Sequence, residues 1–282
     1  MTAHVDMLQL MSRLKAADEP FVLATVIRTV SVTAAKAGAK AIIRADGRIE
    51  AGWIGGGCAR GATLKAALAA LADGRSRLVS IQPENLLAEL GVKPGEGRHG
   101  VEFAKNMCPS QGTMDIFVEP MLPPPLLVIL GASPVALALA EQARLLGYQV
   151  TLAAPLSELP EIPEVDLVVD GFAVDVPRKR QCFVVVSTQG KGDEAALRSS
   201  LAMDCRYRGF VGSRRKMASL RGKLLAQGIE AARLDEVKAP AGLDLGAITP
   251  EEIALSIIAE ITGLRRQGQR DLAHYQSETK EV

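Results

Sequence analysis

The stretch Leu126-Leu-Val-Ile-Leu-Gly-Ala-Ser-Pro134 joins an uninterrupted apolar run to a glycine turn and the start of a helix. Five consecutive apolar residues are typical of a strand buried on both faces of a parallel sheet. Ser133 suits the N-cap of the following helix, and Pro134 suits its first turn. That helix is expected to end at Gly147, before a second strand over Tyr148–Leu152. The stretch therefore predicts the first βαβ unit of a Rossmann-like domain.

The same alternation continues toward the end of the chain. Strands are expected over Cys182–Ser187 and Tyr207–Val211, each followed by a helix. A last helix begins with the capping-box pattern Thr249-Pro-Glu-Glu252 and carries isoleucines at helical spacing. We interpret residues 121–282 as a doubly wound α/β domain with a parallel sheet.

Three consecutive prolines in Met121-Leu-Pro-Pro-Pro125 mark the expected boundary with a first domain, residues 1–120. A proline run cannot join a sheet ladder and favours an extended spacer. The first domain is predicted to be mixed α/β, with an amphipathic first helix and a hairpin turn at Asp46-Gly47. The glycine-rich segment 83–107, with one short helical piece, is expected to be a functional or locally mobile loop.

In the first domain, three glycines, a thiol and a guanidinium lie between an apolar strand and an alanine-rich helix expected over Ala59–Leu71. The residues concerned are Gly55, Gly56, Gly57, Cys58 and Arg60. Glycines let a backbone approach a ligand closely, and a helix N-terminus attracts anions. The segment is therefore either a cradle for an anionic ligand or a tight turn beside a small buried cysteine.

The glycine turn of the second domain departs from the dinucleotide-binding fingerprint. Its residues are Gly131, Ala132, Ser133 and Pro134, so a serine stands where the fingerprint has its second glycine. The acidic residue that would bind a ribose is also missing, because the second strand ends in Leu152-Ala-Ala-Pro155. A Rossmann domain kept for its shape is favoured over an NAD site, with an NAD-dependent oxidoreductase as an alternative.

A basic segment lies at a later strand-to-helix junction. Residues 206–223 contain seven cations and no acidic residue. Within it, Gly212, Ser213, Arg214 and Arg215 combine an N-cap serine with two guanidiniums, which suits a phosphate. The alternative is a solvated basic helix face. Ligands of open α/β sheets bind at the carboxyl ends of the strands, which favours the phosphate site.

Composition excludes several classes of function. The chain is 48% hydrophobic and 23% charged, with a formal net charge of +1, so nothing in the overall charge favours nucleic acid or an anionic membrane. Only 4% of the residues are aromatic, which argues against a base-stacking platform. No apolar run approaches the ~20 residues of an integral membrane helix. The N-terminus lacks the pattern of a secretory signal, so a cytoplasmic location is expected.

The cysteines and histidines do not form a recognisable metal site. The four cysteines are far apart in the sequence and form no CxxC pair, and no histidine has a partner at metal-ligand spacing. Cys108 lies in a loop before a proline and is expected to be exposed. Cys182 and Cys205 are expected in the core.

Several motifs together resemble the XdhC/CoxI family of maturation factors for molybdenum hydroxylases such as xanthine dehydrogenase and carbon monoxide dehydrogenase. In the first domain these are Ala24-Thr-Val26, Gly38-Ala-Lys40, Gly56-Gly-Cys58 and Gly112-Thr-Met-Asp-Ile-Phe-Val-Glu-Pro120. In the second they are Val184-Val-Val-Ser-Thr188, Phe210-Val-Gly-Ser-Arg-Arg-Lys216 and Gly242-Leu-Asp-Leu-Gly-Ala-Ile-Thr-Pro-Glu-Glu-Ile-Ala-Leu255. The resemblance is nearest to the carbon monoxide dehydrogenase accessory proteins.

The resemblance implies a family-specific first domain, a C-terminal Rossmann domain, a homodimer and a molybdenum hydroxylase client. It also implies binding, sulfuration or insertion of a pterin-based molybdenum cofactor. Three positions depart from the family pattern: Arg60 replaces a common acid, Gln189 follows Thr188 where histidine is common, and Cys108-Pro-Ser replaces Cys-Gly-Gly. Losing an acid and a histidine removes two proton-transfer groups, which favours binding over catalysis.

The leading hypothesis is an assembly chaperone that holds a dinucleotide cofactor between its two domains for a client enzyme. Molybdopterin cytosine dinucleotide is the first choice of cofactor and FAD the second, and Arg60 is expected to clamp a phosphate. The rival is an enzyme in which Cys58 carries sulfur to molybdenum. The predicted cofactor contacts are Gly55–Cys58, Arg60, Gly131–Pro134, Thr188, Gln189 and Gly212–Arg215.

Overall fold

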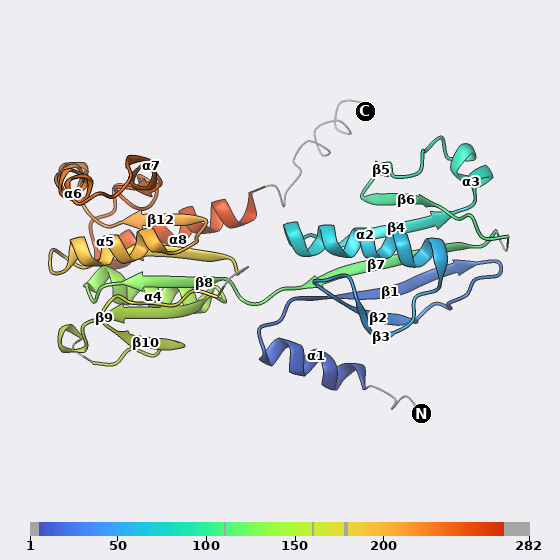
Figure 1. Cartoon of the computed structure of the whole chain (residues 1–282), viewed down its shortest axis with the longest axis horizontal. Coiled ribbons are helices and arrows are strands. Elements are labelled where there is room, and N and C mark those ends of the chain that lie inside the picture. The colour runs from blue at the N-terminus through green and yellow to red at the C-terminus, as the bar shows by residue number, and fades with distance from the viewer. Residues whose placement is uncertain (1–5, 110, 160, 178–179, 268–282) are drawn as a thin grey trace. The chain divides into compact units, whose positions relative to one another are not determined.

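The computed structural model describes residues 6–109, 111–159, 161–177 and 180–267. Figure 1 shows the order of the elements along the chain. The chain divides into two compact units, Met1–Pro123 and Pro124–Val282. No helix in the described ranges is long and apolar enough to cross a membrane.

The N-terminal unit is built on a seven-stranded mixed sheet. Its strands are β1 (Phe21–Val30), β2 (Lys40–Arg44), β3 (Ile49–Gly52), β4 (Arg77–Gln82), β5 (Gly97–Arg98), β6 (Val101–Lys105) and β7 (Thr113–Met121), in the order β3-β2-β1-β7-β4-β6-β5. β1 pairs antiparallel with both β2 and β7, whereas β4 pairs parallel with β6. The mixed α/β first domain expected from the sequence is confirmed.

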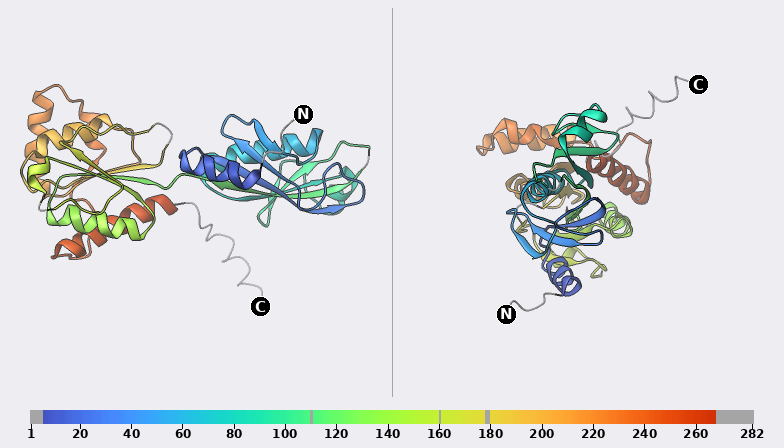
Figure 2. Two further views of the ribbon diagram at one scale, coloured as in Figure 1. Left: turned by 90° about the horizontal axis from the view of Figure 1, so that it is seen from below. Right: turned by 90° about the vertical axis from the view of Figure 1, so that its right-hand side faces the viewer.

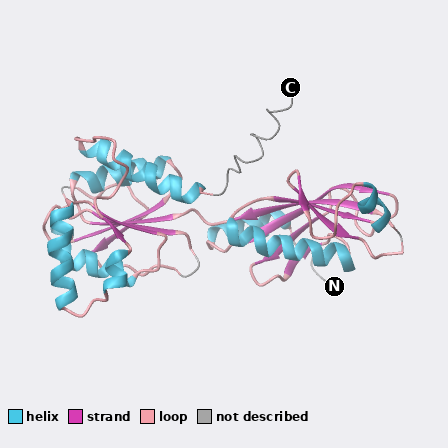
Figure 3. Ribbon diagram, turned by 90° about the horizontal axis from the view of Figure 1, so that it is seen from above, coloured by secondary structure: helices cyan, strands magenta, loops and turns pink. Residues whose placement is uncertain are grey.

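Two helices pack on opposite faces of this sheet. α2 (Gly57–Asp73) buries small residues such as Ala66, Ala67 and Ala70 against the central strands, and Figure 3 shows it lying along the sheet. α1 (Met7–Ala16) buries Leu10 and Leu14 against the other face. Alanines let α2 approach the sheet closely, where it packs on β1, β4 and β7.

The short helical piece expected in segment 83–107 is confirmed, but the expectation of a loop over the remainder is wrong where strands form. α3 (Glu84–Glu89) is followed by β5 and β6, and β6 extends the sheet beside β4. All five residues of β6 are half-buried, so neither face of this strand requires a clear apolar pattern in the sequence. Its pairing to β4 decides its conformation.

The C-terminal unit contains a six-stranded, all-parallel sheet. Its strands are β8 (Leu126–Leu130), β9 (Gln149–Ala154), β10 (Leu167–Asp170), β11 (Cys182–Val186), β12 (Tyr207–Phe210) and β13 (Val237–Lys238). Their order is β10-β9-β8-β11-β12-β13, and every pair is parallel. This is the strand order of a Rossmann fold, and the doubly wound domain expected from the sequence is confirmed.

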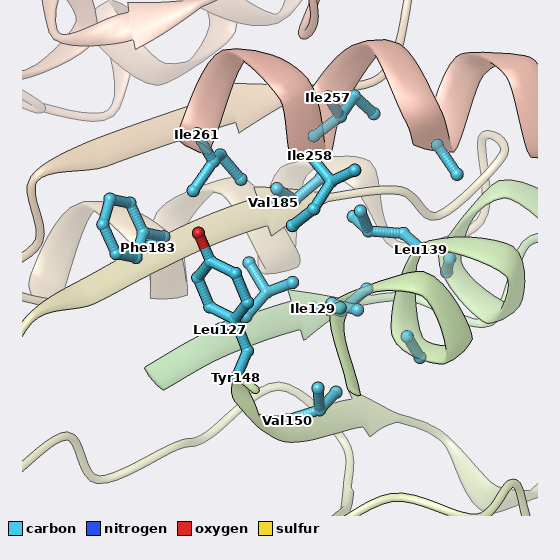
Figure 4. Packing of buried hydrophobic residues seen from close by; sticks show 14 of the residues in the cluster. Leu127, Ile129, Leu139, Tyr148, Val150, Phe183, Val185, Ile257, Ile258 and Ile261 are labelled. Carbon is cyan, nitrogen blue, oxygen red and sulfur yellow. The ribbon is translucent and has the colours of Figure 1, made fainter. Parts of the chain in front are cut away.

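Helices cover both faces of the parallel sheet. α4 (Pro134–Leu145) and α8 (Pro250–Arg266) pack side by side on one face, as the left view of Figure 2 shows. α5 (Asp193–Ala202) and α6 (Arg214–Ala226) cover the other face, and the short α7 (Ala231–Asp235) precedes β13. Figure 4 shows the core beneath α4 and α8, where Tyr148 meets Phe183 edge to face at 6.0 Å.

The chain reverses its order across this sheet between β8 and β11. From β8 it proceeds through α4 to β9, whereas β11 leads through α5 to β12 on the other side. The loops after β8 and β11 therefore meet at a topological switch point, where ligands of open α/β sheets commonly bind.

Candidate functional site

The turn from β3 to α2 is shaped by its glycines. Gly55 has a φ of 102°, in the left-handed region that favours glycine, and a Cβ there would lie 3.3 Å from the Cβ of Ala59. Gly56 is the N-cap of α2 and provides no side-chain cap, and the first helical turn has no acidic residue. No side chain of the helix therefore accepts from the first N–H groups of α2 or neutralises its positive N-terminus, which leaves both available to an anion.

This turn forms one wall of a pocket of about 330 Å³, which we call the thiol pocket. Its lining residues are 32–34, 55–59, Ile81, 106–108, Gly112 and Met114. None of them is charged, and most of the side chains are apolar. Sulfur-containing side chains of Cys58, Met107, Cys108 and Met114 border the cavity.

The loop after β6 forms another wall and contacts Cys58 directly. The Met107 N–H donates to Cys58 Sγ at 3.3 Å. Asn106 holds the loop at two points, because its Oδ1 accepts from the Cys108 N–H at 2.9 Å and its Nδ2 donates to the Gly112 carbonyl at 2.6 Å. A Cβ on Gly112 would collide with the Val32 carbonyl, so a glycine is required where this loop passes the end of β1.

Arg60 does not line the thiol pocket. It is exposed on the first turn of α2, and no guanidinium is among the described residues that line the cavity. The role of Arg60 as a phosphate clamp stays a prediction. The sequence indicated Cys108 only as an exposed thiol, and the structure adds that it shares the pocket with Cys58.

At the switch point of the C-terminal unit, the hydroxyl of Ser133 is engaged in hydrogen bonds within the protein. Its hydroxyl caps α4 by accepting from the Ala136 N–H at 3.1 Å, and it lies 2.6 Å from the hydroxyl of Ser187. Gly131 has a φ of 128°, and a Cβ there would collide with the Ser187 carbonyl. The turn Gly131–Pro134 is thus packed tightly against the end of β11, with Ser133 only 6% exposed.

Thr188 and Gln189 follow β11 at the same edge and differ in environment. Thr188 is buried and donates to the Asp193 carboxylate, whereas Gln189 is exposed with a φ of 55°. Lys216 also pairs with Asp193, at 2.7 Å. Burial raises the pKa of Asp193, but the hydrogen bonds from Lys216 and Thr188 outweigh it and hold that pKa below its ordinary value.

Several cations of the basic segment 206–223 have partners inside the fold. Arg208 is buried and donates to the Ser200 and Met203 carbonyls and to Glu236. Lys216 pairs with Asp193 and lies 5.4 Å from the ring of Phe210, while Arg221 pairs with Asp235 at 2.8 Å. These side chains are therefore structural and do not belong to a solvated basic face.

Part of this segment nevertheless lines a second cavity, the edge pocket, of about 650 Å³. It lies at the carboxyl ends of β12 and β13 and is lined by residues 211–214, 238–247, Ile253 and Ser256. Gly212, Ser213 and Arg214 border it, and Ser213 caps α6. Arg215 is exposed and does not line it. The sequence motif beginning at Gly242 provides its other wall.

Two family models match the chain. Residues 14–82 match the XdhC and CoxI family, and residues 127–261 match the XdhC Rossmann domain. The chain belongs to the XdhC and CoxI family. Residues 55–60 lie within the first matched segment, and residues 131–134 and 212–215 lie within the second. Cys108 lies outside both, so these matches do not extend to the second thiol.

Curated relatives of this family member are similar over only part of their length. The uncharacterized protein YqeB of Escherichia coli is 29% identical over 89% of this chain and 44% of its own length. A Bacillus subtilis protein named as a probable xanthine dehydrogenase subunit is 28% identical over 55% of this chain and 47% of its own. The chain thus spans about half the length of the curated relatives it matches.

A solved structure of a xanthine dehydrogenase from Bacillus halodurans is also similar. It is 19% identical, with a TM-score of 0.46, over 95% of this chain and 98% of that one. The narrower resemblance to carbon monoxide dehydrogenase accessory proteins stays a prediction.

Proposed function

We propose that this XdhC and CoxI family member is a maturation factor that binds the dinucleotide cofactor of a molybdenum hydroxylase and assists its insertion. Family membership and a relative named as a probable xanthine dehydrogenase component support a client of this class. Molybdopterin cytosine dinucleotide is the first choice of cofactor and FAD the second. A homodimer is part of the proposal.

The thiol pocket is the observation that supports this function most directly. It joins an uncapped helix start to four bordering sulfur-containing side chains. Thiols and thioethers suit soft, polarisable ligands, and the α2 N–H groups suit an anion. These features fit the sulfur-bonded metal end of a molybdopterin better than the large flavin ring of FAD.

The volume of the pocket limits what it can hold. Pockets for drug-sized ligands measure about 300–1,000 Å³, so 330 Å³ accommodates one end of a dinucleotide rather than the whole. Cys58 and the N–H groups of α2 would hold that end.

In the edge pocket, Arg214 and the start of α6 offer a guanidinium and helix N–H groups of the kind that bind phosphate.

The lining of the thiol pocket favours binding over acid–base catalysis. No histidine, carboxylate or lysine is among the described residues that line it, so apart from the two thiols no side chain there is placed to transfer a proton. The NAD-dependent alternative has less support, because Ser133 is buried in internal bonds and β9 ends without an acidic residue.

The test is cofactor binding by the full-length chain. The purified protein is incubated with molybdopterin cytosine dinucleotide or with FAD, passed through a size-exclusion column and denatured. Oxidised-pterin fluorescence and flavin absorbance then identify what was retained. We expect retained pterin with the wild type, and at least tenfold less with Ala34→Trp, in which an alanine of the pocket wall is enlarged.

Ala17→Trp is the matched control, since Ala17 is exposed and lies outside the pocket. It should retain as much pterin as the wild type. Equal retention by Ala34→Trp and Ala17→Trp would refute the assignment of the thiol pocket. Retention of neither cofactor by the wild type would refute the proposed function.

A further inference from the structure

We propose that Cys58 and Cys108 form a two-thiol relay that converts sulfane sulfur to sulfide inside the thiol pocket. Cys58 belongs to the first turn of α2, and Cys108 to the loop between β6 and β7. They lie in different elements, yet both line the same cavity. The relay rests on the proposed function in one respect, because a cofactor bound in this pocket would be the acceptor of the sulfide.

The loop that carries Cys108 contacts Cys58 directly. The Met107 N–H donates to Cys58 Sγ at 3.3 Å, and Cys108 is the next residue. Consecutive Cα atoms are about 3.8 Å apart, and a disulfide joins Cα atoms about 4.4–6.8 Å apart. In the relay, a movement of this loop brings the two sulfurs to bonding distance. Asn106 keeps Cys108 in position through its bond to the Cys108 N–H.

The remaining cysteines are unsuited to the reaction. Cys182 is buried, and desolvation raises the pKa of its thiol to about 12. Burial also raises the pKa of Cys205. Cys182 and the half-buried Cys205 pack in the core of the C-terminal unit, whereas the half-buried Cys58 and the exposed Cys108 line the thiol pocket. Cys58 and Cys108 are thus the two thiols that line one pocket, which is the arrangement of an attacking and a resolving cysteine.

The first step loads sulfur onto Cys58. The Cys58 thiolate attacks the outer sulfur of a persulfide donor, R–S–SH, and forms Cys58–S–SH while R–S⁻ leaves. The S–S bond of the donor breaks and a new S–S bond forms on Cys58, so no net oxidation occurs.

The second step releases the sulfur as sulfide. The Cys108 thiolate attacks the inner sulfur of Cys58–S–SH, forming the Cys58–Cys108 disulfide and expelling HS⁻. The sulfane sulfur is reduced to sulfide, and the two cysteines together supply the electron pair as they become a disulfide. A dithiol reductant returns the disulfide to two thiols. Sulfur must be at the oxidation level of sulfide to replace a ligand at a metal. The two cysteines of the pocket supply the electrons for this reduction, so that step needs no external electron donor.

The experiment follows sulfide and disulfide directly. The reduced full-length protein is treated briefly with inorganic polysulfide, desalted, and kept without reductant while released sulfide is measured. We expect the wild type to release sulfide and to contain the Cys58–Cys108 disulfide in its peptide map. Cys108→Ser should retain the Cys58 persulfide, visible as one added sulfur by mass spectrometry, and release sulfide at least tenfold more slowly.

Two further variants complete the design. Cys58→Ser should neither retain sulfur in the pocket nor release sulfide, and Cys205→Ser should behave as the wild type. Equal sulfide release by the wild type and Cys108→Ser, or the absence of the Cys58–Cys108 peptide, would refute the relay. Cofactor retention, measured as above, separates the two proposals: retention without the relay leaves the proposed function standing, and the relay without retention refutes the proposed function alone.

Discussion

Ser133 shows how a single side chain changes the use of a Rossmann turn. Its hydroxyl caps α4 and contacts Ser187, so two neighbouring strand ends are joined at the position where a dinucleotide fingerprint has glycine. The backbone of Gly131 also packs closely against the Ser187 carbonyl, so the same two strand ends are in contact through the backbone as well. The turn is thus built for packing at the switch point.

Replacing Gly131 with alanine is expected to destabilise the C-terminal unit by about 2–4 kcal/mol, because the Cβ collides with backbone and a φ of 128° is strained for alanine. Urea unfolding measures the difference. Gly222→Ala is the control, because Gly222 lies in α6 with open space around it, and this variant should be more stable by about 0.5–1 kcal/mol. Similar midpoints for the two variants would contradict the packing argument.

Asp193 makes the stability of the C-terminal unit dependent on pH. Its folded pKa lies below its ordinary value, so its contribution is present above the unfolded pKa, about 3.9, and is lost as pH falls through the folded pKa. Asp193→Asn should therefore cost about 1–2 kcal/mol at pH 7, with a smaller difference from the wild type below pH ~4. Urea unfolding at both pH values is the measurement.

The control for this titration is Asp204→Asn, which changes an exposed carboxylate in the same unit. It should leave the midpoint at pH 7 nearly unchanged. A constant difference between Asp193→Asn and the wild type across the pH range would mean that packing, and not charge, accounts for its effect.

At the scale of elements, α2 and α8 begin in opposite ways. α8 has a complete capping box from Thr249 and Glu252 and two acidic residues in its first turn. α2 has a glycine N-cap and no acidic residue there. Capping and acidic side chains stabilise a helix start and neutralise its positive end. The N-terminus of α8 is therefore stabilised by its own side chains, whereas the uncapped, positive N-terminus of α2 borders the thiol pocket.

This contrast predicts opposite effects on stability and binding when α2 is capped. Gly56→Asp should stabilise the protein by a few tenths of a kcal/mol, since the backbone of Gly56 is extended and a Cβ meets only Trp53, at 3.9 Å. The added carboxylate should weaken retention of an anionic cofactor about tenfold, because it bonds to the helix N–H groups and repels the anion. Thermal unfolding and the retention assay measure the two effects.

Gly222→Asp adds the same charge on an exposed position of α6, outside the thiol pocket. It should leave cofactor retention unchanged. Undiminished retention by Gly56→Asp would show that the α2 N-terminus does not contact the anion.

At the scale of the whole molecule, each unit has its own hydrophobic cores. The buried clusters of the N-terminal unit lie between Leu10 and Val118, and those of the C-terminal unit between Leu126 and Ile261. The division falls within the proline run, at Pro123–Pro124. Separate cores on either side of a short spacer are what independent folding requires.

A fragment spanning residues 124–282 should therefore fold alone with a cooperative unfolding transition. Far-UV circular dichroism and thermal unfolding of this fragment, compared with the full-length chain, provide the measurement. Its midpoint should lie within a few degrees of one transition of the full chain. A fragment without a cooperative transition would show that the N-terminal unit is needed for the Rossmann core.

Local patterns were enough to predict the Rossmann unit. β8 and the start of α4 follow from an apolar run, a glycine turn and an N-cap serine, and α8 follows from its capping box and spaced isoleucines. β6 was missed because its five residues are half-buried, which leaves little alternation to detect. The three glycines and the thiol before an alanine-rich helix led to Gly55–Cys58, although Arg60, the expected clamp, lies outside the pocket.

The sequence by itself determined the alternation of strands and helices, the proline spacer and the glycine turn before α2, because each depends on neighbouring residues. Only the tertiary structure decided which distant residues meet. It placed Cys108 in the same pocket as Cys58, paired β6 with β4, and gave Arg208 and Lys216 acidic partners inside the fold. These outcomes depend on contacts between segments far apart in the chain, whose free energy is set by packing and burial and not by local conformational preference.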